Sequence, residues 1–182
     1  MDKKFPKQIP IFPLSGVIYF PRTNLPLNIF EERYLDLVND SFRNDKLMGM
    51  VQSKRENSLV YRVGCLGKIS DYQETSDGRV LINLIGITRF EITKEITSKK
   101  KYREFEVDYK KFDKDLVVPN KIEAVYDQFN FMEKVKKFFE KNGLMINWKE
   151  FEKLDDSQRI NTLSMIAPIS NEEKQKLLET VT

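Results

Sequence analysis

The sequence lacks histidine altogether and has a single cysteine, Cys65. Without histidine there is no imidazole to act as a general base near neutral pH, and no Ser-His or Cys-His nucleophilic pair can form. One cysteine cannot form an intramolecular disulfide, and one thiolate without imidazoles does not make a zinc site. Catalysis or metal binding would therefore depend on other groups, and the cysteine content fits a reducing compartment.

Long apolar runs and phosphate-binding glycine motifs are also missing. No apolar run approaches the roughly 20 residues that a membrane-spanning helix needs, and the N-terminal MDKKFPKQIP lacks the apolar segment of a signal peptide. Neither GxxxxGK[ST] nor a strand–GxGxxG–helix pattern occurs, so nucleotide binding of the standard kinds has no support. We predict a cytoplasmic protein with no cofactor and no membrane partner.

Charge of one sign is not in large excess. The chain of 182 residues has 31 basic and 28 acidic side chains and a net charge of +3, which indicates a soluble surface and gives no general argument for nucleic acid. The one basic run, Lys99-Lys100-Lys101-Tyr102-Arg103, lies between two strand-like segments. Its position favours a solvated loop over a binding patch.

Proline, in contrast, is concentrated in residues 9–34, at positions 10, 13, 21 and 26. A helix interior does not tolerate this spacing, because each proline removes a backbone donor and pushes the preceding residue toward extended geometry. The apolar side chains between the prolines still need burial, at roughly 1.5–3 kcal/mol each. This stretch therefore predicts short strands and turns around a β core.

Hydrophobic periodicity organises the rest of the first half. It predicts a helix over residues 29–43 and extended segments over 47–52, 63–74, 80–96 and 102–112. Asp77-Gly78 is typical of a hairpin turn, and Gly86 is expected to bend the 80–96 segment into two strands. Gly64 and Gly67 suit a bulge or the close approach of a neighbouring backbone.

The second half of the chain is predicted to be helical. A long amphipathic helix is predicted from Pro119 to Asn142-Gly143, followed by a short helix around Trp148. A third helix is capped by Asp155 or Asp156, and a last one opens with the capping-box spacing of Ser170 and Glu173. Strands followed by helices indicate the α+β class. We expect two subdomains, a β-rich one over residues 1–114 and a helical one over 115–182.

Carboxylate pairs are the remaining candidates for chemistry. Glu31-Glu32, Asp155-Asp156 and Glu172-Glu173 could bind a divalent cation, but each lies at a predicted helix start, where acidic residues favour the helix dipole. Cys65 in a predicted strand is expected to be a buried small apolar residue. Composition does not exclude a Ser-Lys dyad, although no spacing singles one out. We therefore predict no catalytic, cofactor-binding or metal-ligating residues.

Several motifs carry a resemblance to a known family. They are Pro10-Ile11-Phe12-Pro13-Leu14, Tyr19-Phe20-Pro21, Leu25-Pro26-Leu27-Asn28-Ile29-Phe30-Glu31, Arg33-Tyr34, Val63-Gly64-Cys65-Leu66-Gly67-Lys68-Ile69, Asp77-Gly78-Arg79, Gly86 with Arg89-Phe90, and the terminal 173–179. In this order they resemble the Lon N-terminal domain family, the substrate-binding domain of Lon proteases. The chain departs from the family pattern at Glu32, where proline is usual, and at Asn28, where histidine is common.

The resemblance implies a PUA-like β pseudo-barrel followed by a C-terminal helical bundle. Full-length Lon continues into an ATPase and a Ser-Lys protease, so this chain resembles the stand-alone version of the domain. It implies a non-catalytic module that recognises unfolded or degron-bearing polypeptides. The motifs do not say whether such a module passes clients to a protease; we expect a role as an adaptor or regulator in protein quality control, with a Lon-type protease as a further partner. The runner-up hypothesis is RNA binding, because PUA-like folds include RNA-binding domains. An enzyme with carboxylate or Ser-Lys chemistry ranks last.

The predicted polypeptide contacts are apolar side chains near the junction of barrel and helices. They are Tyr19, Phe20, Leu25, Tyr34 and Phe129. The competing interpretation for each is core packing, since aromatic residues in the motifs of a β barrel usually hold it together.

Overall fold

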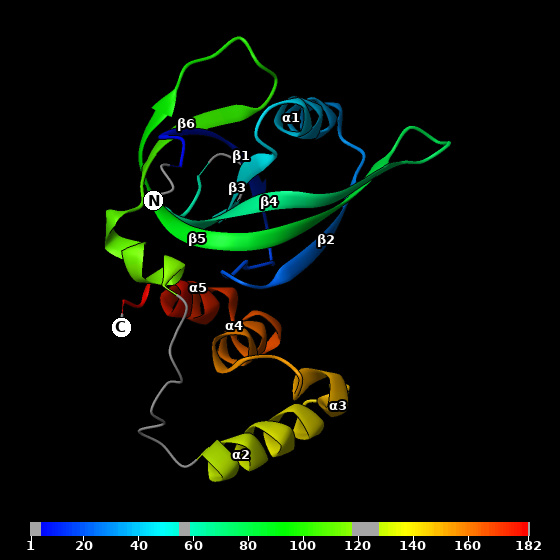
Figure 1. Cartoon of the computed structure of the whole chain (residues 1–182), viewed down its shortest axis with the longest axis vertical. Helices are drawn as coiled ribbons and strands as arrows, with labels where there is room; N and C mark the ends of the chain where they lie inside the picture. The colour runs from blue at the N-terminus through cyan, green and yellow to red at the C-terminus, as the bar shows by residue number, and fades with distance from the viewer. Residues whose placement is uncertain (1–4, 55–58, 118–127, 182) are drawn as a thin grey trace.

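The computed structural model describes residues 5–54, 59–117 and 128–181. The strands come first along the chain: β1 (Gln8–Leu14), β2 (Asn24–Ile29), β3 (Leu47–Gln52), β4 (Val63–Glu74), β5 (Val80–Ile96) and β6 (Arg103–Asp108), with α1 (Glu32–Arg43) between β2 and β3. The 3-10 helix η1 (Lys110–Leu116) follows, and then α2 (Gln128–Lys141), α3 (Trp148–Phe151), α4 (Asp156–Ile166) and α5 (Asn171–Glu179). Figure 1 shows the strands gathered at one end and α2–α5 at the other. The α+β class is confirmed.

The sheet closes into a ring through its longest strand. The strand order is β2-β5-β4-β3-β1-β6, and β6 also pairs with β5. One edge of β5 pairs with β4, while the other pairs with β2 over residues 80–85 and with β6 over residues 91–96. The strands β5, β4, β3, β1 and β6 therefore form the pseudo-barrel that the resemblance implied, and β2 extends it on one side.

The expectation that Gly86 divides the 80–96 segment was wrong, because β5 runs through without a break. Gly86 remains paired with Gly67 of β4, and the pairing register shifts at the next residue, leaving Ile87 as an extra residue on β5. A second shift toward β6 leaves Thr93 extra. Bulges bend a strand and increase its twist. They let one long strand curve around the barrel where two shorter strands were expected.

The interior of the ring is packed with apolar side chains from all five of its strands. They include Ile9, Ile11, Val51, Leu66, Phe90, Ile92, Phe105 and Val107. Phe90 lies over Gly49 and Gly64, where an added Cβ would come within 3.0 and 2.8 Å of its ring. The glycines thus make room for the Phe90 ring inside the barrel.

A second core lies between the sheet and α1. The helix buries Tyr34, Leu37 and Val38 in this layer, against residues of β1 to β5. Helix α1 begins at Glu32, later than predicted, because residues 24–29 are held in the ladder with β5.

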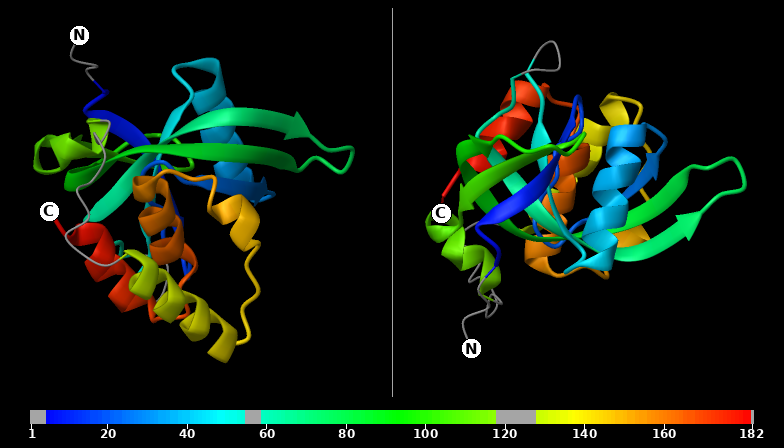
Figure 2. Two further views of the ribbon diagram at one scale, coloured as in Figure 1. Left: turned by 60° about the horizontal axis from the view of Figure 1, so that its bottom comes forward. Right: turned by 90° about the horizontal axis from the view of Figure 1, so that it is seen from above.

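The C-terminal helices have a small core of their own and reach the barrel through their last two members. Phe139, Phe151 and Leu163 join α2, α3 and α4, while Leu178 of α5 packs with side chains of the barrel side. Figure 2 shows α4 and α5 lying under the strands. The predicted start of the long helix at Pro119 lies outside the described residues, and the division into subdomains at residue 114 stays a prediction.

Candidate functional site

Four of the five predicted contact residues are buried in this structure. Tyr19, Leu25 and Tyr34 belong to one core cluster with exposures of 9% or less, and Phe20 belongs to the cluster that receives Leu178. The side chain of Phe129 lies outside the described part of the chain. The structure thus brings Tyr19, Leu25 and Tyr34 together as packing, and a role for the five residues in binding stays a prediction.

Tyr19 combines burial with an unusual polar environment. Its hydroxyl contacts the backbone position of Gly67, where an added Cβ would lie 2.8 Å from the oxygen. Among the described residues this hydroxyl has no hydrogen-bond partner, and burial raises the pKa of Tyr19 far above its usual range. The side chain therefore acts as an apolar ring at this position, which suits the core.

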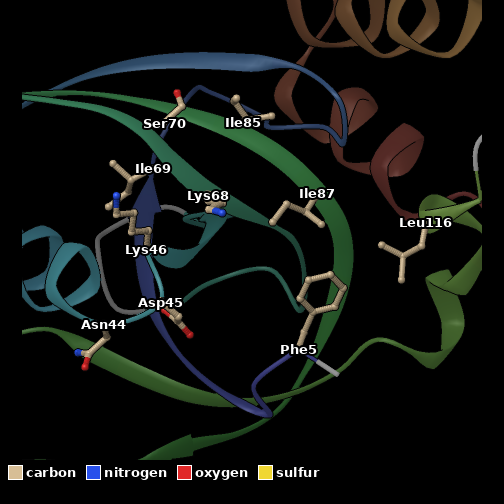
Figure 3. Close-up of a pocket in the computed structure, with 10 residues that line it drawn as sticks. All are labelled: Phe5, Asn44, Asp45, Lys46, Lys68, Ile69, Ser70, Ile85, Ile87 and Leu116. Atoms are coloured by element: carbon tan, nitrogen blue, oxygen red, sulfur yellow. The ribbon is translucent and has the colours of Figure 1, made fainter. Parts of the chain in front are cut away.

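A hollow of about 1220 Å³, the barrel-mouth pocket, lies at the open end of the ring. Its apolar walls include Phe5, Ile85, Ile87 and Leu116, and Lys68 of β4 adds a charge (Figure 3). Ile85 and Leu116 are 43% and 45% exposed. The bulge at Ile87 brings strand β5 around this mouth, so the same distortion that closes the barrel also shapes the pocket.

A second hollow, the side pocket, adjoins the first. Its volume is about 660 Å³, and it shares Phe5 and Leu116 with the barrel-mouth pocket. The Phe5 ring lies 5.6 Å from the ring of Tyr109, and the Tyr109 hydroxyl donates a hydrogen bond to the Pro6 carbonyl at 2.9 Å. These contacts fix the N-terminal segment beside the mouth. Phe5 and Leu116 are the two apolar residues that both hollows share, and we refer to this pair as the apolar ridge.

The barrel-mouth pocket has the chemistry of a binding surface. Within the described ranges there is no group of three or more carboxylate, thiol or imidazole side chains that could hold a metal ion. Lys46 is directed toward α1, with its Nζ atom 4.7 Å from the centre of the Phe42 ring. Asp45 accepts a hydrogen bond from the Leu47 backbone at 3.0 Å. The pocket thus offers apolar area together with charged groups, of which Lys68 makes no ion pair with any described residue.

The basic run of residues 99–103 is largely neutralised. Lys100 pairs with Glu104 at 2.9 Å, Lys101 pairs with Glu32 and with Asp36, and Arg103 pairs with Glu95 at 2.7 Å. Lys100 and Arg103 also lie over the rings of Tyr102 and Phe105. Charges engaged in this way attract phosphates less, so the structure favours the solvated-loop interpretation over the RNA-binding one.

None of the described helices is long and apolar enough to cross a membrane.

Two solved structures share this fold. A crystal structure of a Lon N-terminal domain protein from Xanthomonas campestris superposes with a TM-score of 0.67 at 20% identity, covering 96% of this chain and 90% of that one. The N-terminal domain of the Mycobacterium avium complex Lon protease gives 0.63 at 18% identity, covering 97% and 91%. At these identities the likeness establishes the fold, with its barrel and C-terminal helices.

Sequence relatives point the same way. The chain is 25% identical to the Lon protease of Syntrophus aciditrophicus over 192 residues, which are 98% of this chain and 24% of that protein. It is 28% identical to the Lon protease of Cytophaga hutchinsonii over 103 residues, 53% of this chain and 13% of that protein. The chain thus spans about a quarter or less of the length of these relatives.

A family model also matches nearly the whole chain. Residues 8–182 match the model described as the ATP-dependent protease La (LON) substrate-binding domain. This match includes every strand and helix of the fold, from β1 to α5. The chain therefore belongs to the family of ATP-dependent protease La (LON) substrate-binding domains.

Proposed function

We propose that this protein recognises unfolded or degron-bearing polypeptides, without transforming them, through the barrel-mouth pocket. The observation that carries the proposal is the open hollow lined by Phe5, Ile85, Ile87 and Leu116. A concave surface that combines apolar walls with a set of polar side chains is typical of a binding site. Membership in a substrate-binding domain family supports polypeptide as the ligand class.

The burial of predicted contact residues such as Tyr19 and Phe20 also supports the barrel-mouth pocket as the binding site. Tyr19 and Phe20 could meet a client only if the core opened, because both are at most 4% exposed. Ile85 and Leu116 are available without any rearrangement. A site built from exposed side chains costs no unfolding energy when it binds.

Fluorescence anisotropy with a labelled, reduced and alkylated small protein tests this proposal. Leu116→Ser should weaken binding about three- to tenfold, because part of a leucine side chain no longer leaves water on association. Val117→Ser is the matched control, since Val117 is 63% exposed and lines neither of the two hollows. The proposal fails if the folded protein binds no unfolded chain up to high micromolar concentration.

We further propose that the protein acts in the cytoplasm as an adaptor or regulator in protein quality control and passes clients to a Lon-type protease. Support comes from the relatives, which are named Lon proteases. Crosslinking in native extract followed by a pull-down tests this role. Wild-type protein should capture a Lon-type protease together with client chains, and Leu116→Ser should lose the clients while keeping the protease.

A further inference from the structure

The two hollows at the barrel mouth form one depression divided by an apolar ridge. Phe5 and Leu116 line both the barrel-mouth pocket and the side pocket. A bound segment that crosses this ridge would place consecutive side chains in both hollows. The charges on the two sides then determine which side chains fit.

The charged side chains on the barrel-mouth side sum to a net positive charge. Its charged side chains are Asp45, Lys46 and Lys68. Asp45 is engaged by the Leu47 backbone and Lys46 lies over the Phe42 ring. Lys68 is exposed on β4, and within the described part of the chain it makes no ion pair. A carboxylate entering this hollow therefore meets a cation that has no competing partner.

The far side of the ridge is acidic. The side pocket is lined by Glu106, Asp108 and Asp113, against Lys7 and Lys110. Asp108 accepts a hydrogen bond from the Lys110 backbone at 2.8 Å, which stabilises the start of η1. Glu106 and Asp113 take part in no ion pair with any described residue. Two carboxylates are thus available to a cationic side chain.

We propose that the depression holds one polypeptide segment of ordered charge: an apolar side chain on the Phe5–Leu116 ridge, an acidic side chain toward Lys68 and a basic side chain toward Glu106 and Asp113. This inference rests on the proposed function, which supplies polypeptide as the ligand, and adds the pattern that the site selects. Charge complementarity of this kind sets specificity and register more than raw affinity.

Fluorescein-labelled peptides of three kinds, acidic, basic and neutral, test the pattern by anisotropy. All contain Phe-Leu-Phe in a serine-rich segment. The acidic kind adds three glutamates, at the N-terminus in one peptide and at the C-terminus in another, and the basic kind adds three lysines in the same two ways. The neutral kind adds no charged residue. Lys68→Glu should weaken the acidic peptide about fivefold and leave the neutral one unchanged. Asp113→Lys should weaken the basic peptide to a similar extent. Both effects should shrink as salt is raised, because the charges are exposed.

Control substitutions that make the same charge changes elsewhere on the surface separate an effect of the charge pattern in the hollows from an effect of the protein's net charge. Lys149→Glu on α3 and Glu140→Lys on α2 alter exposed residues away from both hollows and should leave every peptide unaffected. The inference is overturned if these controls act as strongly as Lys68→Glu and Asp113→Lys. It is also overturned if neither pocket reversal has an effect while Leu116→Ser weakens all three kinds of peptide, a result that leaves the proposed function intact. Absence of binding by every peptide overturns both.

Discussion

The guanidinium of Arg89 holds the carboxylate of Asp115 in a two-point contact, with nitrogen–oxygen distances of 2.7 and 2.9 Å. The same guanidinium donates to the carbonyls of Leu178 and Thr180 at 2.9 and 2.6 Å and lies 4.5 Å from the centre of the Phe112 ring. It therefore ties strand β5 to η1 and to the end of α5. Three segments far apart in the sequence meet at one side chain.

Replacing Arg89 by lysine should lower the free energy of unfolding by about 2–4 kcal/mol. The two side chains of the pair are only 15% and 9% exposed, and lysine cannot reproduce the planar two-point contact, so Asp115 would be left incompletely paired. Urea denaturation followed by circular dichroism measures the change. Arg79→Lys, in an exposed pair with Asp77, should cause no measurable loss. Equal effects of the two substitutions would contradict the structural role given to Arg89.

Gly86→Ala should destabilise the protein by about 3 kcal/mol or more. A Cβ at this position would lie 2.2 Å from the backbone oxygen of Phe20 and 3.0 Å from Cα of Pro21, and backbone atoms cannot move aside as a flexible side chain can. Thermal unfolding measures the loss. Gly78→Asn in the β4–β5 turn is the control, because Gly78 has φ +83° and nothing within 4 Å, and asparagine tolerates that conformation. A mild effect at Gly86 would show that the segment before β2 is free to shift.

Local chemistry explains why much of the fold was predictable from the sequence. Ser170 and Glu173 form the capping box that their spacing predicted, and Asp155 caps α4 through the Gln158 backbone. These contacts join residues three apart, so the sequence contains all the information they need. Strand β3 also has its predicted bounds, because its apolar run is ended by polar residues on both sides.

Long-range packing explains why the candidate site was not predictable. Leu25 and Ile85 are both aliphatic residues in strands, yet Leu25 is 7% exposed and Ile85 is 43% exposed. Only the closure of the ring and the position of η1 decide which of them faces a core. The signal that could have drawn attention to the mouth is Leu116, an apolar residue just after a run of charged residues.

Glu173→Gln should make stability less sensitive to acid. The Ser170 backbone donates a hydrogen bond to the Glu173 carboxylate at 2.8 Å and lowers its pKa below the usual 4.5. A carboxylate whose pKa is lower in the folded state contributes stability above its unfolded pKa and loses it as the pH falls through the folded value. In Glu173→Gln the midpoint of urea unfolding should therefore fall less than in the wild type between about pH 5 and about pH 3, the range around the usual pKa of a glutamate. Parallel pH profiles would contradict the assignment.

Cys65 gives a direct readout of whether the core between the sheet and α1 stays closed. Its side chain is 0% exposed on β4, and burial raises the pKa of the thiol well above its usual value, so both access and thiolate formation are suppressed. The native protein should react with a thiol reagent at least about 100-fold more slowly than the urea-unfolded protein, because labelling requires opening. A variant combining Cys65→Ser with Ser70→Cys moves the lone thiol to an exposed position of the same strand and should label rapidly in the native state. Arg89→Lys should accelerate labelling of Cys65 if undocking of η1 and α5 limits opening. Fast labelling of the native wild type would show that the folded chain does not protect the Cys65 thiol.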